Sequence, residues 1–405
     1  MDDLFNKKDL VENEFISPIE IKNKEKYYYD LDNILYSNSG RIDALDSNLF
    51  FIEAGKLISN AIFLFEKGYF DCAFYSLRQS LELSVTTLYL ISQKDKHEEW
   101  NKQQKIFLND KMLNYLKEHE LDFSDLREKL SDFFDRIWKT KEKLNKFVHK
   151  QGYRTFYSVR NSPIYSTKFS KNKFLEEFEK YLCDCIGAVA IYRLSIDPFP
   201  ILLSDEEIYR RMFEMMCEPF SYDFLNKYIG HDVIEKYKTT NIYKGYYEQI
   251  MENEAQNDAI WDIIHNQYID RGKSTEIKSQ IHLLNVSEKI VFEIFCISNK
   301  ISKVHCYEGL LWYFSDVKSL KTTNHTIGGD SFSKHFESPD TYNYPFYEVY
   351  LSFVKILNEN YYLEHNTSLS SEEVGQMKEL VNKYNQVYEK LTSAIDLLMN
   401  SNKTE

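Results

Sequence analysis

Glycine and proline are scarce in this chain of 405 residues, which contains 12 glycines and 7 prolines. Both residues interrupt regular structure, so their scarcity leaves few turn signals and favours long helices. The chain also lacks a run of 18 uninterrupted apolar residues, and its polar start, MDDLFNKKDL, has no signal-peptide pattern. We therefore expect a soluble, cytoplasmic protein without a membrane-spanning segment.

The motifs of several enzyme classes are missing as well. The sequence holds no Gly-x-Ser-x-Gly nucleophile turn, no Gly-x-Gly-x-x-Gly dinucleotide motif and no His-Glu-x-x-His zinc motif. Its six cysteines lack zinc-ligand spacing and suit reduced, mostly buried thiols better than a disulfide framework. We expect no metal and no other cofactor.

The pattern of apolar residues becomes helical at residue 50. Helical spacing continues until closely spaced prolines follow Asp197, and these cannot continue a helix. We therefore predict a helical bundle over 50–197, with the polar residues 1–49 as an arm that docks on it. The helices expected in the bundle cover 50–67, 70–92, a segment ending near 118, 125–149 and 173–195.

A second domain is predicted over 201–405. Ser204 with Glu207 three residues later is a helix-capping pattern, and it opens this half of the chain. Helices are expected at 222–237, 242–251, 258–268, 287–314 and 371–400. The last has an apolar seam wide enough to pack on a domain or a partner helix. The expected fold class is thus all-α.

Positive charge is concentrated in residues 136–173. This segment has eleven basic residues and one acid, Glu142, so its net charge is +10 in a chain whose total is −13. Tyrosine and phenylalanine are interleaved with the cations and could stack on single-stranded bases. One interpretation is a surface that binds RNA or phosphate. The other is a solvated helix face that pairs with the acidic remainder.

His149 lies inside this segment, at the end of a predicted helix. Cleavage of RNA by its own 2′-hydroxyl needs groups that accept and donate protons and a cation for the charge on phosphorus. A histidine can serve as either base or acid near neutral pH. In a regular helix, Asn145 and Lys146 share the face of His149, whereas Lys143 lies about 120° away. The alternative is that His149 caps the helix end.

Two segments resemble the HEPN superfamily of small helical bundles, which includes metal-independent ribonucleases of toxin and antiviral systems. The matching residues at the start of the second helix are Gly68, Tyr69, Phe70, Asp71, Ala73, Gln79, Ser80 and Glu82. Active members carry an arginine four to six residues before a histidine, with a polar residue after the arginine. Here the histidine is His149 and the polar residue is Asn145.

The arginine of that motif is missing, because four-residue spacing places Leu144 there and five-residue spacing places Lys143. Lys143 or Lys146 substitutes for it, Arg78 or Arg154 enters from elsewhere, or the domain no longer cleaves. Arg78 and Glu82 are four apart, which is typical of an ion pair on a helix surface. The resemblance thus suggests a catalytic group of His149, Asn145, Lys146 and Lys143, with Arg78, Gln79 and Glu82 supporting the site. The residues expected to bind RNA are Arg136, Lys139, Lys150, Arg154, Tyr153 and Arg160.

The resemblance also implies a homodimer that brings two copies of His149 together. It leaves three functions open. The protein could be an RNA-cleaving effector of a bacterial toxin or phage-defence system. It could instead be a non-catalytic scaffold for a partner protein from the same operon, or an adaptor whose C-terminal half senses a phage component.

Overall fold

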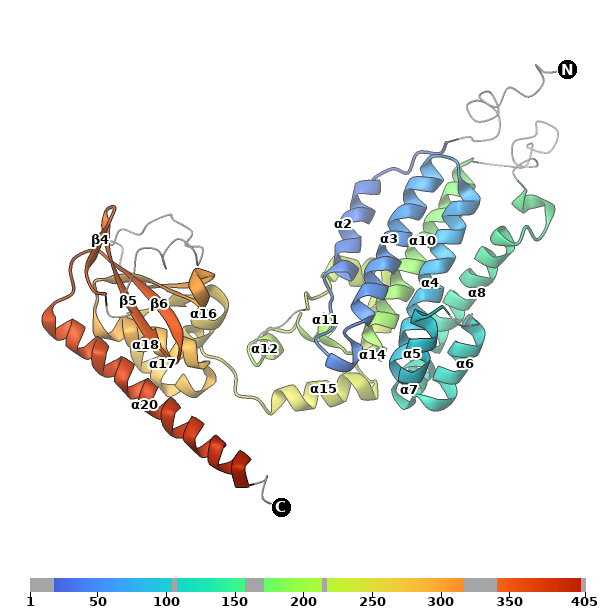
Figure 1. Cartoon of the computed structure of the whole chain (residues 1–405). Coiled ribbons are helices and arrows are strands. Elements are labelled where there is room, and N and C mark those ends of the chain that lie inside the picture. The colour runs from blue at the N-terminus through green and yellow to red at the C-terminus, as the bar shows by residue number, and fades with distance from the viewer. Residues whose placement is uncertain (1–17, 104–107, 157–170, 213–216, 316–340, 402–405) are drawn as a thin grey trace. The chain divides into compact units, whose positions relative to one another are not determined.

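The computed structural model describes residues 18–103, 108–156, 171–212, 217–315 and 341–401. Contacts divide the chain into two units, Met1–Glu254 and Ala255–Glu405. The first unit is helical and the second is built on a sheet (Figure 1). Each unit is described by itself.

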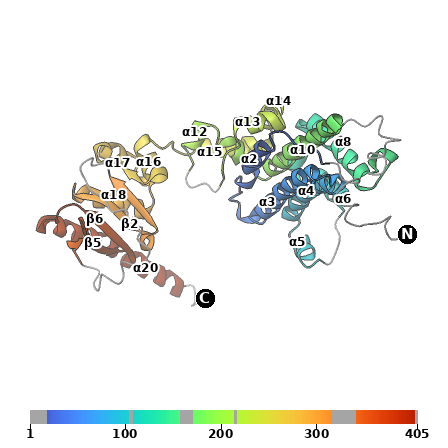
Figure 2. The same ribbon diagram turned by 90° about the horizontal axis from the view of Figure 1, so that it is seen from above.

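Four long helices form the centre of the first unit (Figures 1 and 2): α3 (Ser47–Glu66), α4 (Phe70–Ser92), α8 (Ser131–Val148) and α10 (Lys171–Leu194). Helix α4 contacts the other three. Their inner faces are rich in large rings, as the composition predicts. The rings of Phe65 and Phe178 stack with centroids 3.8 Å apart, and those of Phe74 and Phe147 stack at 4.2 Å.

Shorter elements complete this unit. They are α2 (Lys24–Leu35), η3 (Ile42–Ala44), α5 (Lys94–Asn101), α6 (Asn109–His119), α7 (Leu121–Lys129), η4 (Tyr153–Thr155), α11 (Phe199–Leu202), α12 (Glu206–Tyr209), α13 (Tyr222–Phe224), η6 (Leu225–Ile229), α14 (His231–Tyr237) and α15 (Asn241–Met251). The polar arm predicted over 1–49 therefore contains a helix, α2, and Leu31 and Ile34 of that helix lie in the core.

The bundle also extends beyond its predicted end at residue 197. Phe224 and Tyr237 belong to the same core, so residues 201–254 lie in the first unit. Gly187 of α10 shows how closely this extension packs. A Cβ at Gly187 would lie 2.2 Å from the carbonyl oxygen of Tyr228 in η6, so glycine is required there.

Helix α3 is, among the described residues, the one helix long and apolar enough to cross a membrane. Its apolar residues Ala54, Ile58 and Phe65 are buried in the bundle core. Gly68 follows with a φ of 84°, and it begins the turn into α4. The predicted helix end at this glycine is confirmed.

The second unit contains a six-stranded sheet, so the all-α prediction is wrong. The strands are β1 (Tyr268–Ile269), β2 (Ile301–Cys306), β3 (Leu311–Ser315), β4 (Tyr344–Phe346), β5 (Val349–Ile356) and β6 (Glu359–His365), in the order β1-β3-β2-β6-β5-β4. The β1–β3 pair is parallel, and the other neighbours are antiparallel.

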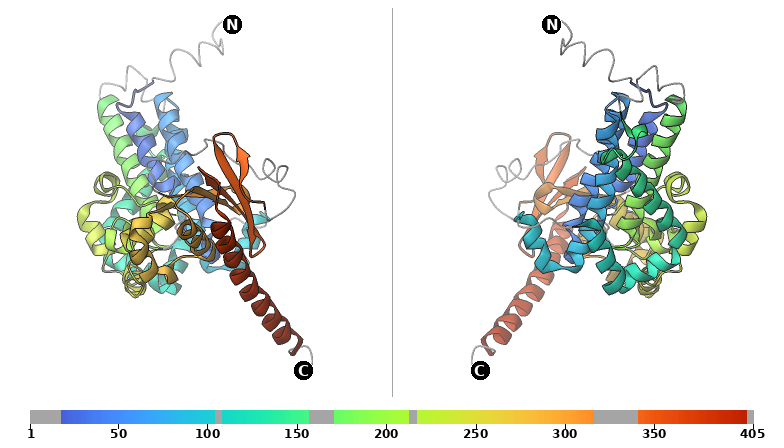
Figure 3. Two further views of the ribbon diagram at one scale, coloured as in Figure 1. Left: turned by 90° about the vertical axis from the view of Figure 1, so that its left-hand side faces the viewer. Right: turned by 90° about the vertical axis from the view of Figure 1, so that its right-hand side faces the viewer.

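The helices and short turns of this unit are α16 (Asp258–Asn266), η7 (Arg271–Lys273), α17 (Ser274–Ser279), η8 (Ile281–Leu283), α18 (Val286–Ile297), η9 (Tyr307–Gly309) and α20 (Ser371–Ser401). Residues of α16, α18 and α20 pack with Val304 and Leu363 on one face of the sheet. The seam predicted for the last helix is used here, since Met377 and Leu380 are buried. The end of α20 projects past the sheet (Figure 3).

The helix predicted over 287–314 is the clearest error. Helix α18 ends at Ile297, and β2 and β3 occupy 301–306 and 311–315. All six residues of β2 are buried, because both faces of the strand are covered. The last four residues of β2 alternate polar and apolar side chains over too short a length to distinguish a strand from a helix, and the pairing with β3 and β6 decides it.

Candidate nucleic-acid interface

Helix α8 presents lysines on one exposed face. It is regular from Ser131 to Val148, with Ile137, Leu144 and Phe147 buried against the bundle. Lys139, Lys143 and Lys146 lie at positions i, i+4 and i+7, which share a helix face. All three are exposed. We call these three residues the lysine face.

No ion pair neutralises the lysine face within the described part of the chain. The acid nearest in sequence, Glu142, is also exposed and lies one turn from both Lys139 and Lys146, yet it forms no ion pair with either among the described residues. Unpaired cations with a common direction produce a local positive potential in an acidic protein. This is the charge pattern expected of a surface that meets phosphate groups.

His149 is the C-cap residue of α8, and its side chain is exposed. The backbone alone satisfies the helix end. The Lys150 N–H donates to the Phe147 carbonyl (3.3 Å), and the Gln151 N–H donates to the Lys146 carbonyl (2.8 Å). This is a Schellman motif, with Lys150 in the left-handed conformation at φ 54°. The helix carbonyls therefore do not need the His149 imidazole as a donor.

The neighbours of His149 follow from the regularity of α8. Asn145 and Lys146 share its face, as expected, whereas Lys143 lies about 120° away. Asn145 is half-buried, and its Oδ1 is buried without a hydrogen-bond partner. Leu144, in the position of the family's arginine, is fully buried in the core. A cation at that position would face the inside of the bundle.

The two segments that carry the resemblance are in contact. Lys150, directly after His149, forms an ion pair with Asp71 in the first turn of α4, and its Nζ also donates to the Thr155 carbonyl at 3.3 Å. The stacked rings of Phe74 and Phe147 lie one turn further along both helices. Lys150, expected to bind RNA, is thus engaged in joining α8 to α4.

The other expected RNA-binding residues divide into two groups. Arg136 contacts the bundle, with its Nε 3.2 Å from Asp184 Oδ1 and its guanidinium over the Phe133 ring. Tyr153 and Arg154 are exposed in η4, just after α8, and Tyr153 is 78% exposed. Arg160 lies outside the described residues.

The three residues expected to support the site lie on α4. Arg78 and Glu82 form the expected ion pair along the helix, at 2.7 Å, and both side chains are largely buried. Arg78 keeps a buried Nε without a hydrogen-bond partner. Gln79 is half-buried beside them. Because the Arg78 guanidinium is paired within α4, it is not a free replacement for the missing arginine.

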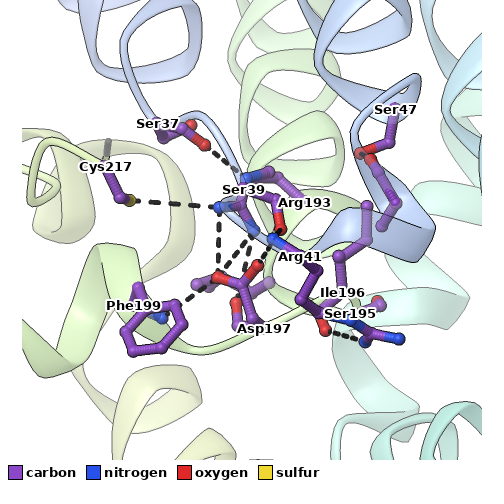
Figure 4. A network of polar contacts seen from close by, with 12 residues as sticks. Ser37, Ser39, Arg41, Ser47, Arg193, Ser195, Ile196, Asp197, Phe199 and Cys217 are labelled. Carbon is purple, nitrogen blue, oxygen red and sulfur yellow. Dashed lines mark hydrogen bonds and ion pairs between the residues drawn. The ribbon is translucent and has the colours of Figure 1, made fainter. Parts of the chain in front are cut away.

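Sequence reasoning missed a buried ion pair between Arg193 and Asp197 near the end of α10 (Figure 4). Both side chains are at most 1% exposed, and two guanidinium nitrogens lie 3.1 Å from Asp197 Oδ1. The Ser39 hydroxyl donates to Asp197 Oδ2 at 2.5 Å, and Arg193 Nε donates to the Ser37 carbonyl. This network joins the segment after α2 to the end of α10. The i, i+4 spacing of the pair was its only sequence signal.

A second buried group lies in the sheet of the second unit, on the face opposite α18. His305 Nε2 is 2.9 Å from Glu364 Oε1, and Lys303 Nζ is 3.8 Å from the same oxygen. His305 and Glu364 are fully buried. Burial lowers the pKa of His305, an effect that its hydrogen bond to Glu364 opposes. The signal in the sequence was the alternation of Lys303 and His305 with apolar residues.

Within the described residues, no three His, Cys, Asp or Glu side chains gather as metal ligands. No protein-family model, curated protein or solved structure matches this chain. The resemblance to the HEPN superfamily therefore rests on the residues quoted above and stays a prediction.

Proposed function

We propose that the first unit is a HEPN-like domain that binds RNA on the lysine face and cleaves it without a metal. The protein would then be an effector of a bacterial toxin or phage-defence system, acting in the cytoplasm where its RNA substrates are. The observation that carries the proposal is the lysine face itself. Its three lysines are exposed and have no ion pair among the described residues, and they lead to a histidine that the helix end does not use.

The proposed reaction is attack of an RNA 2′-hydroxyl on the adjacent phosphorus. One neutral His149 accepts the hydroxyl proton as the O2′–P bond forms. A protonated His149 from a second copy donates a proton to O5′ as the P–O5′ bond breaks, leaving a 2′,3′-cyclic phosphate and a 5′-hydroxyl. Lys146 stabilises the charge that develops on the phosphoryl oxygens. A homodimer with two nearby His149 residues supplies both proton-transfer groups.

The experiment compares His149→Ala with His231→Ala, an exposed histidine elsewhere in the same unit. Full-length protein is incubated with RNA in excess EDTA, and the products are analysed for cyclic phosphate ends. We expect the parent and His231→Ala to cleave. His149→Ala should lose about 10²- to 10⁴-fold in rate, the usual contribution of general acid–base groups. Light scattering should give a dimer for all three proteins.

A non-catalytic scaffold is the second candidate, and the burial of Leu144 in place of the family's arginine favours it. In that case the lysine face binds a partner protein from the same operon, and the second unit senses a phage component. Binding of RNA without cleavage by the parent would favour this function. Undiminished cleavage by His149→Ala would show that another residue is catalytic.

A further inference from the structure

A groove opens between α6, α7 and α8, outside the lysine face. Its volume is about 430 Å³, within the range of small-molecule sites. Six of the residues that line it have polar or aromatic side chains: Asp110, Asn114, Lys117, Arg127, Asp135 and Trp138. None of these side chains belongs to the proposed catalytic group.

The inner end of the groove is apolar. A second, smaller hollow of about 20 Å³ shares Leu113, Arg127 and Trp138 with the groove and continues towards Phe134 and Tyr192. Trp138 is 40% exposed, and Lys141 Nζ lies over its ring at 5.4 Å from the centroid, so a ligand would meet the rest of the indole. A flat apolar wall with an accessible indole suits an aromatic heterocycle.

Two cations of the groove, Lys117 and Arg127, face two carboxylates, Asp110 and Asp135, and Lys141 beside the groove adds one further positive charge. Lys141 is paired with Asp110 at 2.8 Å, and Arg127 lies 3.5 Å from Asp135 while its guanidinium covers the Phe134 ring. Lys117 has no ion pair within the described part of the chain. Burial lowers its pKa and the nearby Arg127 lowers it further, while Asp110 and Asp135 act in the opposite direction. A bound anion would relieve the repulsion between these two cations.

We propose that this groove binds a nucleotide, with the base on Trp138 and the phosphate between Lys117 and Arg127. Asn114 and the two carboxylates offer hydrogen-bond partners to the ribose hydroxyls and the base edge. A base, a ribose and a phosphate are present both in a free mononucleotide and in one nucleotide of an RNA strand that extends from the lysine face into the groove. The site does not depend on cleavage by His149.

The test uses full-length protein and three probes: 5′-AMP, adenosine and a short adenine-rich RNA. Calorimetry and quenching of tryptophan fluorescence report binding. We expect 5′-AMP to bind more tightly than adenosine, because adenosine lacks the phosphate. Trp138→Ala should weaken 5′-AMP by about 5- to 150-fold, the range for a base stacked on an aromatic ring. Lys117→Ala should remove the preference for 5′-AMP over adenosine.

Three controls keep the result interpretable. Lys111→Ala changes an exposed lysine on the same helix, α6, and should leave binding unchanged. Trp100→Phe should retain the quenching that Trp138→Phe loses. His149→Ala should bind 5′-AMP like the parent, which separates this site from the proposed reaction. Circular dichroism must show that each variant is folded.

The arms of the experiment distinguish the source of the nucleotide. Competition between the RNA and 5′-AMP, with loss of both in Trp138→Ala, assigns the groove to a base of the strand. Binding of 5′-AMP without competition assigns it to a free nucleotide. The proposal is overturned if the parent binds neither 5′-AMP nor the RNA. It is also overturned if Trp138→Ala and Lys117→Ala leave the binding unchanged.

Discussion

The lysine face and the Arg193–Asp197 network place cations of the same helical bundle in opposite environments. Lys139, Lys143 and Lys146 are exposed and unpaired within the described residues, and they project from one side of α8. Arg193 is fully buried and satisfied by Asp197 and the Ser37 carbonyl. Within each set the residues lie at helical spacing, so the spacing in the sequence does not distinguish an exposed set from a buried one.

The difference shows which charges the fold needs. A buried guanidinium without its carboxylate would be strongly unfavourable, so each partner in the network depends on the other. Exposed lysines contribute little to folding, whether paired or not. The lysine face therefore requires an explanation outside stability, and binding of phosphate supplies one.

The largest expected effect is on the buried side of this comparison. Arg193→Met leaves Asp197 buried without its main cation, and we expect a loss of about 3–5 kcal/mol in the free energy of unfolding. Denaturant titration of the full-length protein measures it. The double variant Arg193→Met/Asp197→Leu should recover part of the loss, since no charge is then left unpaired. A single variant as stable as the parent would show that the pair is not important for folding.

A pH change extends the comparison to the second unit. Burial lowers the pKa of both His305 and His365, so below pH about 6.5 each imidazole binds a proton less readily in the folded protein than in the unfolded chain. The unfolded state then holds more protons, and stability falls as the pH drops below that value. Each group contributes at most about 1.4 kcal/mol per pH unit.

Hydrogen exchange of the full chain, read on peptides from β2 and β6 after correction for intrinsic rates, measures this effect. Protection should fall between pH 7 and pH 5.5. His365→Gln should reduce the dependence, because the imidazole that contacts Ser352 and the Thr367 carbonyl is gone. Protection that is independent of pH in the parent would contradict a lowered pKa for these two histidines.

Substitution of the lysine face is expected to have the smallest effect on stability and a large effect on RNA binding. The triple variant Lys139→Gln/Lys143→Gln/Lys146→Gln should change unfolding by about 0.5 kcal/mol or less per site, as is usual for surface substitutions. Its affinity for single-stranded RNA should fall. The slope of log affinity against log salt should decrease by about 2, since each phosphate contact contributes about 0.7.

The matched control is Lys26→Gln/Lys56→Gln/Lys180→Gln, which removes the same charge from exposed positions on α2, α3 and α10. We expect this control to bind RNA with nearly the parent's salt slope. An equal loss of RNA affinity in both triple variants would show that net charge, and not the lysine face, determines RNA binding. If neither variant loses RNA affinity, RNA binding is no longer part of the proposed function.

Much of the first unit could be predicted from the sequence, because its helices are long and their hydrophobic stripes repeat many times. The end of α3 at Gly68 and the amphipathic pattern of α8 depend on contacts within a few residues. The exposure of Lys139, Lys143 and Lys146 follows from that same pattern. The partners of Lys150 and Arg136 were not predictable, since Asp71 and Asp184 are distant in the sequence.

What the sequence determined by itself was local: where helices lie, which of their faces are buried, and where positive charge gathers. The tertiary structure decided the sheet, the buried polar groups and the groove beside Trp138. Strands β2 and β6 pair across about sixty residues, and their ladder depends on that partner. A buried charge is likewise stabilised by whichever opposite charge the folded chain brings to it. Residues that make such long-range contacts leave no repeating pattern in the sequence. Sequence patterns therefore do not predict these contacts, which form only when the chain folds.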